Sequence, residues 1–431
     1  MLKETIFNLK SQPVMGVVSV LGTALCLLLV MMVTVLTETG TVAVSPESNR
    51  DRLLYDHYIC IYNNDKSQSS SLGRLTIERL YSNLPSAECM SLCDATFSST
   101  DVENDGVAPV IVDQRGTDGN YWKIFDHQFV AGGPITEDDV NTSNKVVVIT
   151  EGVARKLFGS ANPVGKTIRI SYKDHVVKGV VRDVSPVMGA GYAQIWTPVD
   201  APKPPAEGEE GVIWNKDWRG QYMAVIMAKT PADVDNVIRE AQARIPALQK
   251  EIQSTTEGMQ RRNAERYPYR QAEYQGRRVN GDEYDIEEDR MMKIILIAIF
   301  LIVPAINLSS MTQGRLSRRR HEIGVRRAFG ARRGEIFATI LGENLLVTLA
   351  GGAIGLLASG IFLWLFADTL IEVPSWNAPG SEVSVTPGML FRWSVFGWAL
   401  LFCFVLNLLS AGLPAWRASR QDPIQALNSR Q

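Results

Sequence analysis

The sequence predicts an α-helical membrane protein with four transmembrane helices and a large α+β domain outside the cytoplasm. Three observations predict this fold class. Four apolar runs are long enough for the roughly 20 residues that cross the hydrocarbon core of a bilayer. A long polar region separates the first two runs, and the basic residues that flank the runs all fall on one predicted side. The runs are Val14–Leu36, Ile294–Met311, Ile336–Phe366 and Leu390–Leu413.

Positive charges assign the orientation of the spans. Lys3 and Lys10 precede the first run, arginines follow the second and fourth, and the stretch 367–388 between the third and fourth contains no Lys or Arg. Because short loops rich in Lys and Arg stay in the cytoplasm, both termini are expected inside. No Ala-x-Ala cleavage site follows the first run, so an uncleaved span is preferred to a signal peptide. We expect a multi-pass protein of the cell inner (cytoplasmic) membrane with a large periplasmic domain.

The polar region predicts one α+β domain that is split by an insertion. Two strand–helix–strand units separated by a long stretch indicate a domain that carries a second, inserted one. The first unit is a strand over Tyr55–Tyr62, a polar turn over 63–71, a helix over 75–84 and an extended run over 88–98. The second unit is a strand over 221–229, a helix from Pro231 to about Ile252 and a strand over 267–275.

The segment Arg315–Glu335 is the most informative stretch of the chain. It contains eight arginines and two glutamates, and its helical spacing predicts a short helix lying flat on the cytoplasmic face. Small residues at Gly324 and Ala328 give this helix a face that a partner protein can contact. The segment is expected to continue without a break into the third span. The alternative is a stop-transfer cluster that anchors the topology or binds anionic lipid.

Several motifs resemble one family. The run HEIGVRRAFGARRGEI from His321, followed by ILGEN from Ile340 and AGGAIG from Ala350, closely resembles the permease region of the MacB/FtsX superfamily. Members of that family are four-helix membrane subunits of ATP-binding-cassette (ABC) systems. The stretches 146–159 and 162–184 are similar to the periplasmic core domain of the same superfamily. The order of elements resembles a MacB-type porter domain with a β-rich inserted subdomain.

The resemblance and the composition together give domain boundaries. The predicted segments are an amphipathic cytoplasmic helix (1–13), the first span (14–37), the extracytoplasmic domain (38–290), the second span (291–312), a cytoplasmic coupling segment (313–335), the third span (336–366), an external loop (367–388), the fourth span (389–414) and a cytoplasmic tail (415–431). Within the extracytoplasmic domain we expect two porter-like halves (38–99 and 216–280), an inserted subdomain (100–215) and a helical stalk (281–290).

The resemblance implies that the coupling segment docks onto an ATPase subunit. The residues implied in docking are Arg320, His321, Glu322, Ile323, Gly324, Arg326, Arg327, Ala328, Gly330, Ala331 and Arg332. A second set is expected to serve helix packing or coupling: Glu343, Gly351, Gly352, Gly355 and Pro304. Glu343 is a carboxyl near the inner end of the third span, and the glycines form a small face suited to close helix packing. Pro304 is either a kink or a tolerated membrane proline.

The sequence predicts no catalysis, no cofactor and no metal site in this chain. Gly159 to Thr167 imitates a phosphate-binding loop, but five residues separate its glycines, a helix precedes it and a strand follows. The ATPase, with its ATP and Mg²⁺, is therefore expected in a separate subunit. His57, His127 and His175 are scattered and are interpreted as structural.

Three cysteines fall in the extracytoplasmic domain. Cys60, Cys89 and Cys93 are an odd number, and no zinc-binding pattern is present. Cys89 and Cys93 are able to bridge only on adjacent turns of a helix, because in a strand they are too far apart. We expect buried thiols, with the oxidation state left open.

The resemblance implies a permease subunit that works as a homodimer in the membrane and transmits force from the ATPase to its external domain. Efflux or release of a substrate would follow, with a periplasmic adaptor and an outer-membrane channel as further partners. The alternative is an FtsX-like regulator that activates a cell-wall hydrolase. A membrane-tethered sensor without an ATPase would leave the ordered arginine segment unexplained. No nucleic-acid partner is expected, and lipoproteins, peptides, toxins and small amphiphiles all remain open as substrates.

Overall fold

The computed structural model describes residues 45–65, 67–184, 186–199, 218–256, 258–262, 266–274, 285–292, 294–296, 298–299, 325 and 329–370, with single positions in 17–29 and 397–405. The chain forms two compact units. One comprises Gly40–Ile286 and Ile371–Ser384, and the other comprises Met1–Thr39, Glu287–Leu370 and Val385–Gln431. The described part of the first unit, residues 45–274, is called the head.

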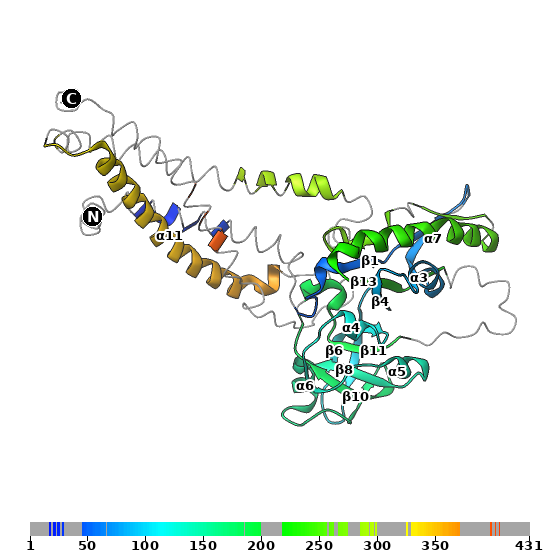
Figure 1. The fold of residues 1–431 in the computed structure, drawn as a ribbon. Helices are drawn as coiled ribbons and strands as arrows, with labels where there is room; N and C mark the ends of the chain where they lie inside the picture. Colours follow the sequence, from blue (N-terminus) through cyan, green and yellow to red (C-terminus); the bar gives the residue numbers. More distant parts are fainter. Residues whose placement is uncertain are drawn as a thin grey trace. The chain divides into compact units, whose positions relative to one another are not determined.

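The head alternates short helices with strands, as an α+β domain does (Figure 1). Its first part contains η1 (Arg50–Arg52), β1 (Leu53–Asp56), β2 (Ile59–Tyr62), β3 (Ser67–Leu72), α3 (Arg74–Tyr81) and β4 (Ala87–Asp94). The middle contains β5 (Ser98–Glu103), β6 (Val110–Thr117), α4 (Tyr121–Ile124), β7 (Phe129–Gly132), α5 (Glu137–Asn141), β8 (Val146–Thr150), α6 (Glu151–Phe158), β9 (Thr167–Ile170), β10 (Lys173–Val181), η2 (Pro186–Gly191) and β11 (Ile195–Pro198). The last part contains β12 (Arg219–Gly220), β13 (Tyr222–Ala228), η3 (Pro231–Asp233), α7 (Val234–Thr255), β14 (Gln260–Arg261) and β15 (Tyr269–Arg270).

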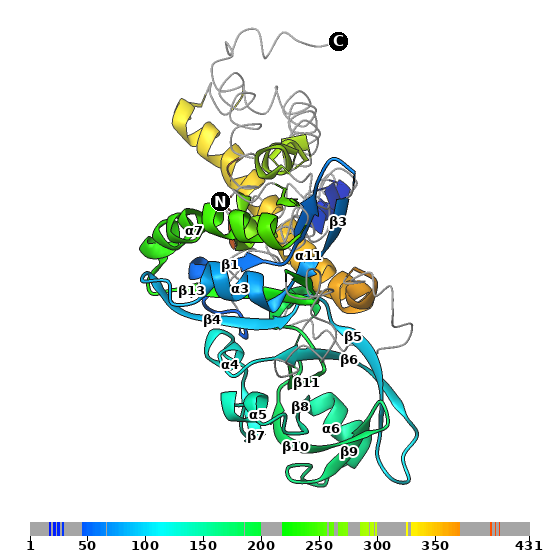
Figure 2. The same cartoon turned by 90° about the vertical axis from the view of Figure 1, so that its right-hand side faces the viewer.

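The first and last parts form one split subdomain. Strand β13 is almost entirely buried and pairs antiparallel with β1 on one side and β4 on the other. Helices α3 and α7 lie side by side on this sheet (Figure 2). An ion pair between Arg79 and Glu251 at 2.9 Å joins the two helices. Arg244 of α7 also donates to the carbonyl of Ser82, just after α3, at 2.6 Å.

The middle part forms the inserted subdomain, in which strands pair in a closed ring, β6–β5–β9–β10–β8–β11 and back to β6. Closing the ring removes exposed strand edges. Valine and isoleucine side chains from these strands and from α6 make up a small core of their own. Helix α6 starts where the Thr150 hydroxyl accepts a hydrogen bond from the backbone N–H of Val153 at 3.4 Å.

A larger core crosses from the split subdomain into the inserted one. Its members include Leu54 and Val225 of the split subdomain together with Tyr121, Phe125 and Trp196 of the inserted subdomain. Strands β4 and β6 also pair between the two subdomains, at Cys93 and Thr117. The head is therefore one packed body rather than two domains joined by a linker.

Most predicted elements of the head are present. The helix predicted over 75–84 is α3, the strand over 221–229 is β13, and the helix from Pro231 is η3 with α7. In the inserted subdomain, the stretches 146–159 and 162–184 form β8, α6 and the hairpin β9–β10. The turn between α6 and β9 has a helix before it and a strand after it, the order that argues against a phosphate-binding loop.

Three predictions for the split subdomain were wrong. The single strand over Tyr55–Tyr62 is two strands, β1 and β2. The polar turn over 63–71 contains β3, in which Ser67–Leu72 pairs with β2 despite its serines. Pairing with β2 overrides the weak strand propensity of serine. The strand over 267–275 is limited to Tyr269–Arg270, and residues 271–274 are helical.

The second unit contains α11 (Arg333–Leu370), a helix that includes the whole apolar run Ile336–Phe366. Among the residues that the structure describes, no helix meets the length and hydropathy needed to cross a membrane. Residues 286–292 are helical, where the lower part of the stalk was predicted. Residues 367–370, predicted as the start of the external loop, are instead the end of α11. The amphipathic helix, residues 371–388 of the predicted loop, the tail and most of the other three predicted spans lie outside the described residues.

Candidate functional site

The elbow is defined as residues 325–335, of which the structure describes Val325 and residues 329–335. The backbone N–H of Phe329 donates to the carbonyl of Val325 at 3.0 Å and closes one helical turn. Gly330 then has a φ of +95°, a conformation that favours glycine. The prediction of an unbroken run into the third span was wrong, because this glycine ends one helix before α11 begins.

A reciprocal cap fixes the start of α11. The backbone N–H of Arg332 donates to Oε2 of Glu335 at 3.1 Å, and the backbone N–H of Glu335 donates to the carbonyl of Arg332 at 3.0 Å. A carboxylate in the first turn of a helix also lies favourably near the positive end of the helix dipole. This cap connects the end of the elbow to the first turn of α11.

Phe329 is 89% exposed at the tip of the elbow. Exposing a phenylalanine side chain instead of burying it costs about 1.5–3 kcal/mol, and large aromatic side chains often dominate the binding energy of interfaces. Phe329 was not among the docking residues predicted from the sequence. Its position between Ala328 and Gly330, as an apolar residue inside an arginine-rich segment, is the signal that identifies it.

The structure places part of the predicted docking set. Gly330 and Arg332 are exposed and Ala331 is half-buried. The remaining residues lie outside the described part of the chain: Arg320, His321, Glu322, Ile323, Gly324, Arg326, Arg327 and Ala328. Pro304 of the packing set lies outside it too.

Helix α11 has a small buried side and a bulky exposed one. Gly351, Gly352 and Gly355 are buried, whereas Leu357 and Leu365 are more than half exposed. Glu343 lies in the first half of the same helix. The three predicted packing glycines therefore share the side of α11 along which another segment approaches its backbone.

The histidines of the head lie in structural surroundings. His127 is packed among Tyr121, Trp122, Phe125 and Trp196, with ring centroids between 4.9 and 6.5 Å away. Both of its ring nitrogens are buried without a hydrogen-bond partner. Burial lowers the pKa of His127 to about 3, so that the ring is neutral at physiological pH. A neutral, unpartnered imidazole in an apolar cluster has no proton-transfer role.

Asp118 is a carboxyl of the head that accepts three short hydrogen bonds. It accepts hydrogen bonds from the Ser91 hydroxyl at 2.7 Å, the Leu92 N–H at 2.8 Å and the Tyr121 N–H at 2.9 Å. Burial raises its pKa to about 6, and these hydrogen bonds limit the rise. The side chain thus ties β4 to the start of α4, a structural role.

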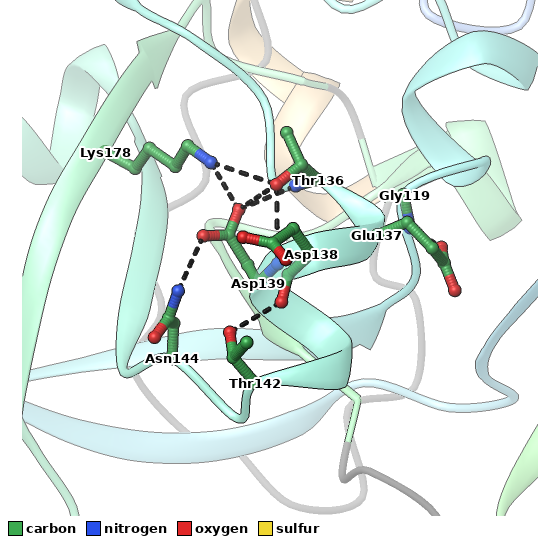
Figure 3. Close-up of polar contacts among 8 residues, drawn as sticks. All are labelled: Gly119, Thr136, Glu137, Asp138, Asp139, Thr142, Asn144 and Lys178. Atoms are coloured by element: carbon green, nitrogen blue, oxygen red, sulfur yellow. Dashed lines mark hydrogen bonds and ion pairs between the residues drawn. The ribbon is translucent and has the colours of Figure 1, made fainter.

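A polar network around Asp139 stabilises α5 (Figure 3). The Thr136 hydroxyl and backbone N–H donate to its carboxylate at 2.7 and 2.8 Å, and Asn144 donates at 3.3 Å. Lys178 of β10 forms an ion pair with the same carboxylate. Although burial alone raises the pKa of Asp139, the hydrogen bonds from Lys178 and Thr136 hold it at about 2. These groups form a capping box and a cross-link between elements.

The described cysteines are thiols, as expected. Cys89 and Cys93 both lie on strand β4, and no disulfide joins them. Burial raises the pKa of the Cys89 thiol to about 11 and of the Cys93 thiol to about 12, which makes both poor nucleophiles. Among the described residues, no group of three or more His, Cys, Asp or Glu side chains is placed to hold a metal ion.

In chain order, the structure thus describes an α+β head, an elbow and the 38-residue helix α11. Two family models match the chain. The MacB-like periplasmic core domain matches residues 17–244, more than half of the sequence, and the FtsX-like permease C-terminal domain matches residues 294–423. The chain belongs to the MacB/FtsX family of ABC transporter permeases.

Curated relatives agree with this assignment. The uncharacterized ABC transporter permease YknZ of Bacillus subtilis is 23% identical over 315 residues, which cover 73% of this chain and 69% of YknZ. The macrolide export ATP-binding/permease protein MacB of Escherichia coli K12 is 24% identical over 337 residues, or 74% of this chain and 43% of MacB. The chain thus spans less than half of the length of that MacB.

Two solved structures of domains outside the cytoplasm align with part of this chain. The extracellular domain of YknZ from Gram-positive bacteria aligns at 15% identity with a TM-score of 0.32, covering 48% of this chain and all of that domain. The periplasmic region of MacB from Actinobacillus actinomycetemcomitans aligns at 20% identity with a TM-score of 0.32, covering 48% of this chain and 89% of that region.

Proposed function

We propose that this chain is a non-catalytic permease subunit that transmits force across the inner membrane. It works as a homodimer with a separate ABC ATPase subunit, and ATP-driven movement of the ATPase displaces the elbow. The spans and the stalk pass this displacement to the head, which expels or releases a substrate outside the cytoplasm. A periplasmic adaptor and an outer-membrane channel are the further partners that we propose.

The elbow is the observation that carries this proposal. An exposed Phe329 on a short helical turn supplies an apolar anchor, and the neighbouring Arg326 and Arg327 supply positive charge. The cap between Arg332 and Glu335 connects this surface to α11. A segment that only anchored the topology would need the charges but neither the exposed aromatic ring nor the capped junction.

The test is co-purification of the full chain with an ABC ATPase subunit from the same organism, co-expressed with it. Arg326→Glu with Arg327→Glu reverses two charges in the docking set and is expected to abolish co-purification while membrane insertion is unchanged. The matched control is Arg239→Glu with Lys250→Glu, two exposed positions on α7 in the head, which should leave co-purification intact. Normal binding of the ATPase to the first variant would overturn the docking assignment.

A second candidate is an FtsX-like regulator, which is favoured by the match of residues 294–423 to the FtsX-like permease domain. In this case the same movement of the head activates a cell-wall hydrolase. Cross-linking of the full chain in intact cells separates the two functions. A hydrolase cross-linked to the head supports regulation, and an adaptor or outer-membrane channel supports efflux.

A further inference from the structure

The N-terminal segment of the head, residues 45–50, is held by the inserted subdomain. The Ser45 hydroxyl donates to the carbonyl of Asp126 at 2.9 Å, and the Asp126 N–H donates to the carbonyl of Pro46 at 3.0 Å. The Ser48 N–H reaches the Asp126 carboxylate at 3.4 Å. Asp126 follows α4 and belongs to the inserted subdomain. Residues 45–48 therefore contact the inserted subdomain before the chain enters β1 of the split subdomain.

Glu47 lies at the centre of this joint and is 0% exposed. Its carboxylate accepts hydrogen bonds from Arg50 Nε at 2.7 Å, from the backbone N–H of Gly191 at 3.0 Å and from Gln271 Nε2 at 3.2 Å. Arg50 also reaches the sulfur of Met188 at 3.6 Å. One buried carboxylate therefore joins three parts of the head: its N-terminal segment, η2 of the inserted subdomain and the helical turn after β15.

The η2 segment is fixed from its other side by Arg115 of β6. The Arg115 guanidinium donates to the carbonyl of Tyr192 at 3.0 Å and to that of Gly189 at 3.2 Å. The Tyr121 hydroxyl donates to the carbonyl of Ala190 at 3.0 Å. Buried side chains of Glu47, Arg115 and Tyr121 thus all hydrogen-bond to the backbone of η2 or of the residue after it, and these bonds fix the position of η2.

Packing at the joint leaves no room for sliding. A Cβ atom added at Gly191 would lie 2.9 Å from Cγ of Pro46 and 3.2 Å from Cγ of Glu47. Opening the joint would expose the pair Glu47–Arg50 or leave one of its charges buried without the other. Removing one partner of a buried ion pair is strongly destabilising, because it leaves an uncompensated charge in the interior. The joint is therefore expected to stay closed while the head moves.

We propose that Glu47 is a positioning residue that locks the N-terminal segment of the head to the inserted subdomain, so that the head moves as one rigid body. This inference rests on the proposed force-transmitting function. The predicted first span ends shortly before Glu47, and Gln271 precedes the predicted stalk. Both connections to the membrane therefore meet at one carboxylate, and a pull on either of them moves the split and inserted subdomains together.

The experiment measures the distance between the two subdomains in the full chain. Spin labels are placed at Tyr172→Cys, which is 87% exposed in the turn between β9 and β10, and at Ala243→Cys on the exposed side of α7. The five native cysteines are replaced by Ser or Ala. Double electron–electron resonance is expected to give one narrow distance distribution, with and without ATP and the ATPase subunit.

The test variant is Glu47→Met with Arg50→Met, which removes both charges together and so leaves no unpaired buried charge. It is expected to broaden the distribution. Glu47→Gln with Arg50→Met removes the same charges but keeps an oxygen that accepts from the N–H of Gly191, and it is expected to restore the narrow distribution. The control is Asp235→Asn with Arg270→Met, which removes an exposed ion pair of the head and should leave the distribution narrow.

A narrow distribution in the methionine double variant overturns the inference, and so does a wild-type distance that changes when ATP is added. If the double variant fails to fold, Gln271→Met takes its place, because it removes the Gln271 hydrogen bond and also a buried oxygen that has no partner. Failure of the proposed function gives a different result from failure of this inference. In that case the wild-type chain does not co-purify with the ATPase, whereas the distances measured without nucleotide are unaffected.

Discussion

At the scale of single residues, burial gives two groups of the head opposite responses to pH. His127 has its pKa lowered to about 3, so the folded state holds it neutral. Asp118 has its pKa raised to about 6, so the folded state favours its protonated form. Stability linked to His127 is present above the ordinary pKa of 6.5 and is lost as the pH falls toward 3. Stability linked to Asp118 is present at low pH and is lost as the pH rises through 6.

His127→Phe is expected to reduce the acid sensitivity of the head. Each pH unit below 6.5 costs the folded state about 1.4 kcal/mol through this side chain. Between pH 7.5 and 5.0, the variant should lose about 2 kcal/mol less of its free energy of unfolding than the wild type. Urea unfolding at the two pH values measures the difference. If the variant and the wild type lose the same free energy of unfolding between these pH values, His127 is not a buried neutral imidazole.

At the scale of elements, the elbow joins two helices through one glycine. The Phe329 N–H donates to the Val325 carbonyl, Gly330 has a positive φ of +95°, and Arg332 caps α11. The Phe329 side chain is 89% exposed next to this glycine. The elbow therefore combines an exposed contact residue with a fixed connection to α11.

Phe329→Ala is expected to weaken co-purification of the ATPase about tenfold or more, because truncating an aromatic anchor at an interface costs about 2 kcal/mol. Phe329→Leu keeps most of the apolar surface and should retain most of the binding. Titration of the detergent-solubilised chain with the ATPase measures both affinities. Equal affinity of the alanine variant and the wild type would exclude this ring from the interface.

The two sides of α11 predict different tolerance to substitution. Gly351→Leu with Gly355→Leu overfills the buried small side and is expected to destabilise the folded chain by about 1–3 kcal/mol. Leu357→Ala on the exposed side should change stability little. The thermal midpoint of each variant in detergent measures this. A double glycine variant that is as stable as the wild type would show that no segment packs closely there.

At the scale of the whole molecule, the continuous core of the head has a consequence for its stability. Phe125 belongs to the inserted subdomain but packs in the core that also contains β13 of the split subdomain. Leu157 belongs to the smaller core around α6. A cavity at Phe125 should therefore lower the stability of both subdomains.

Phe125→Ala is expected to cost about 3–5 kcal/mol and to lower the protection of the β13 amides against hydrogen exchange at least a hundredfold. Leu157→Ala should lower the protection of β8 and β10 more than that of β13. Mass spectrometry of exchanged peptides compares the two variants. If β13 is unaffected by Phe125→Ala, the subdomains unfold independently, and the rigid-body inference also fails.

Much of the fold was predicted from the sequence alone. The periodic apolar residues of α7 and the strong strand formers of β13 have a local signal, and their elements were predicted correctly. The family was predicted from the long motif at His321 and from the core-domain stretches, and the two family models agree with it. Strand β3 was missed, because its serines form a strand only when β2 lies beside them.

The sequence by itself determined the class of protein, the boundary between polar and apolar segments and the cationic elbow, because hydropathy and charge are properties of short stretches. The tertiary structure alone decided that Glu47, Gly191 and Gln271 meet, that one core crosses both subdomains and that Gly330 interrupts the elbow. These features depend on contacts between residues far apart in the chain, or on a single backbone angle. Neither leaves a periodic pattern in the sequence, because each depends on how the folded chain packs.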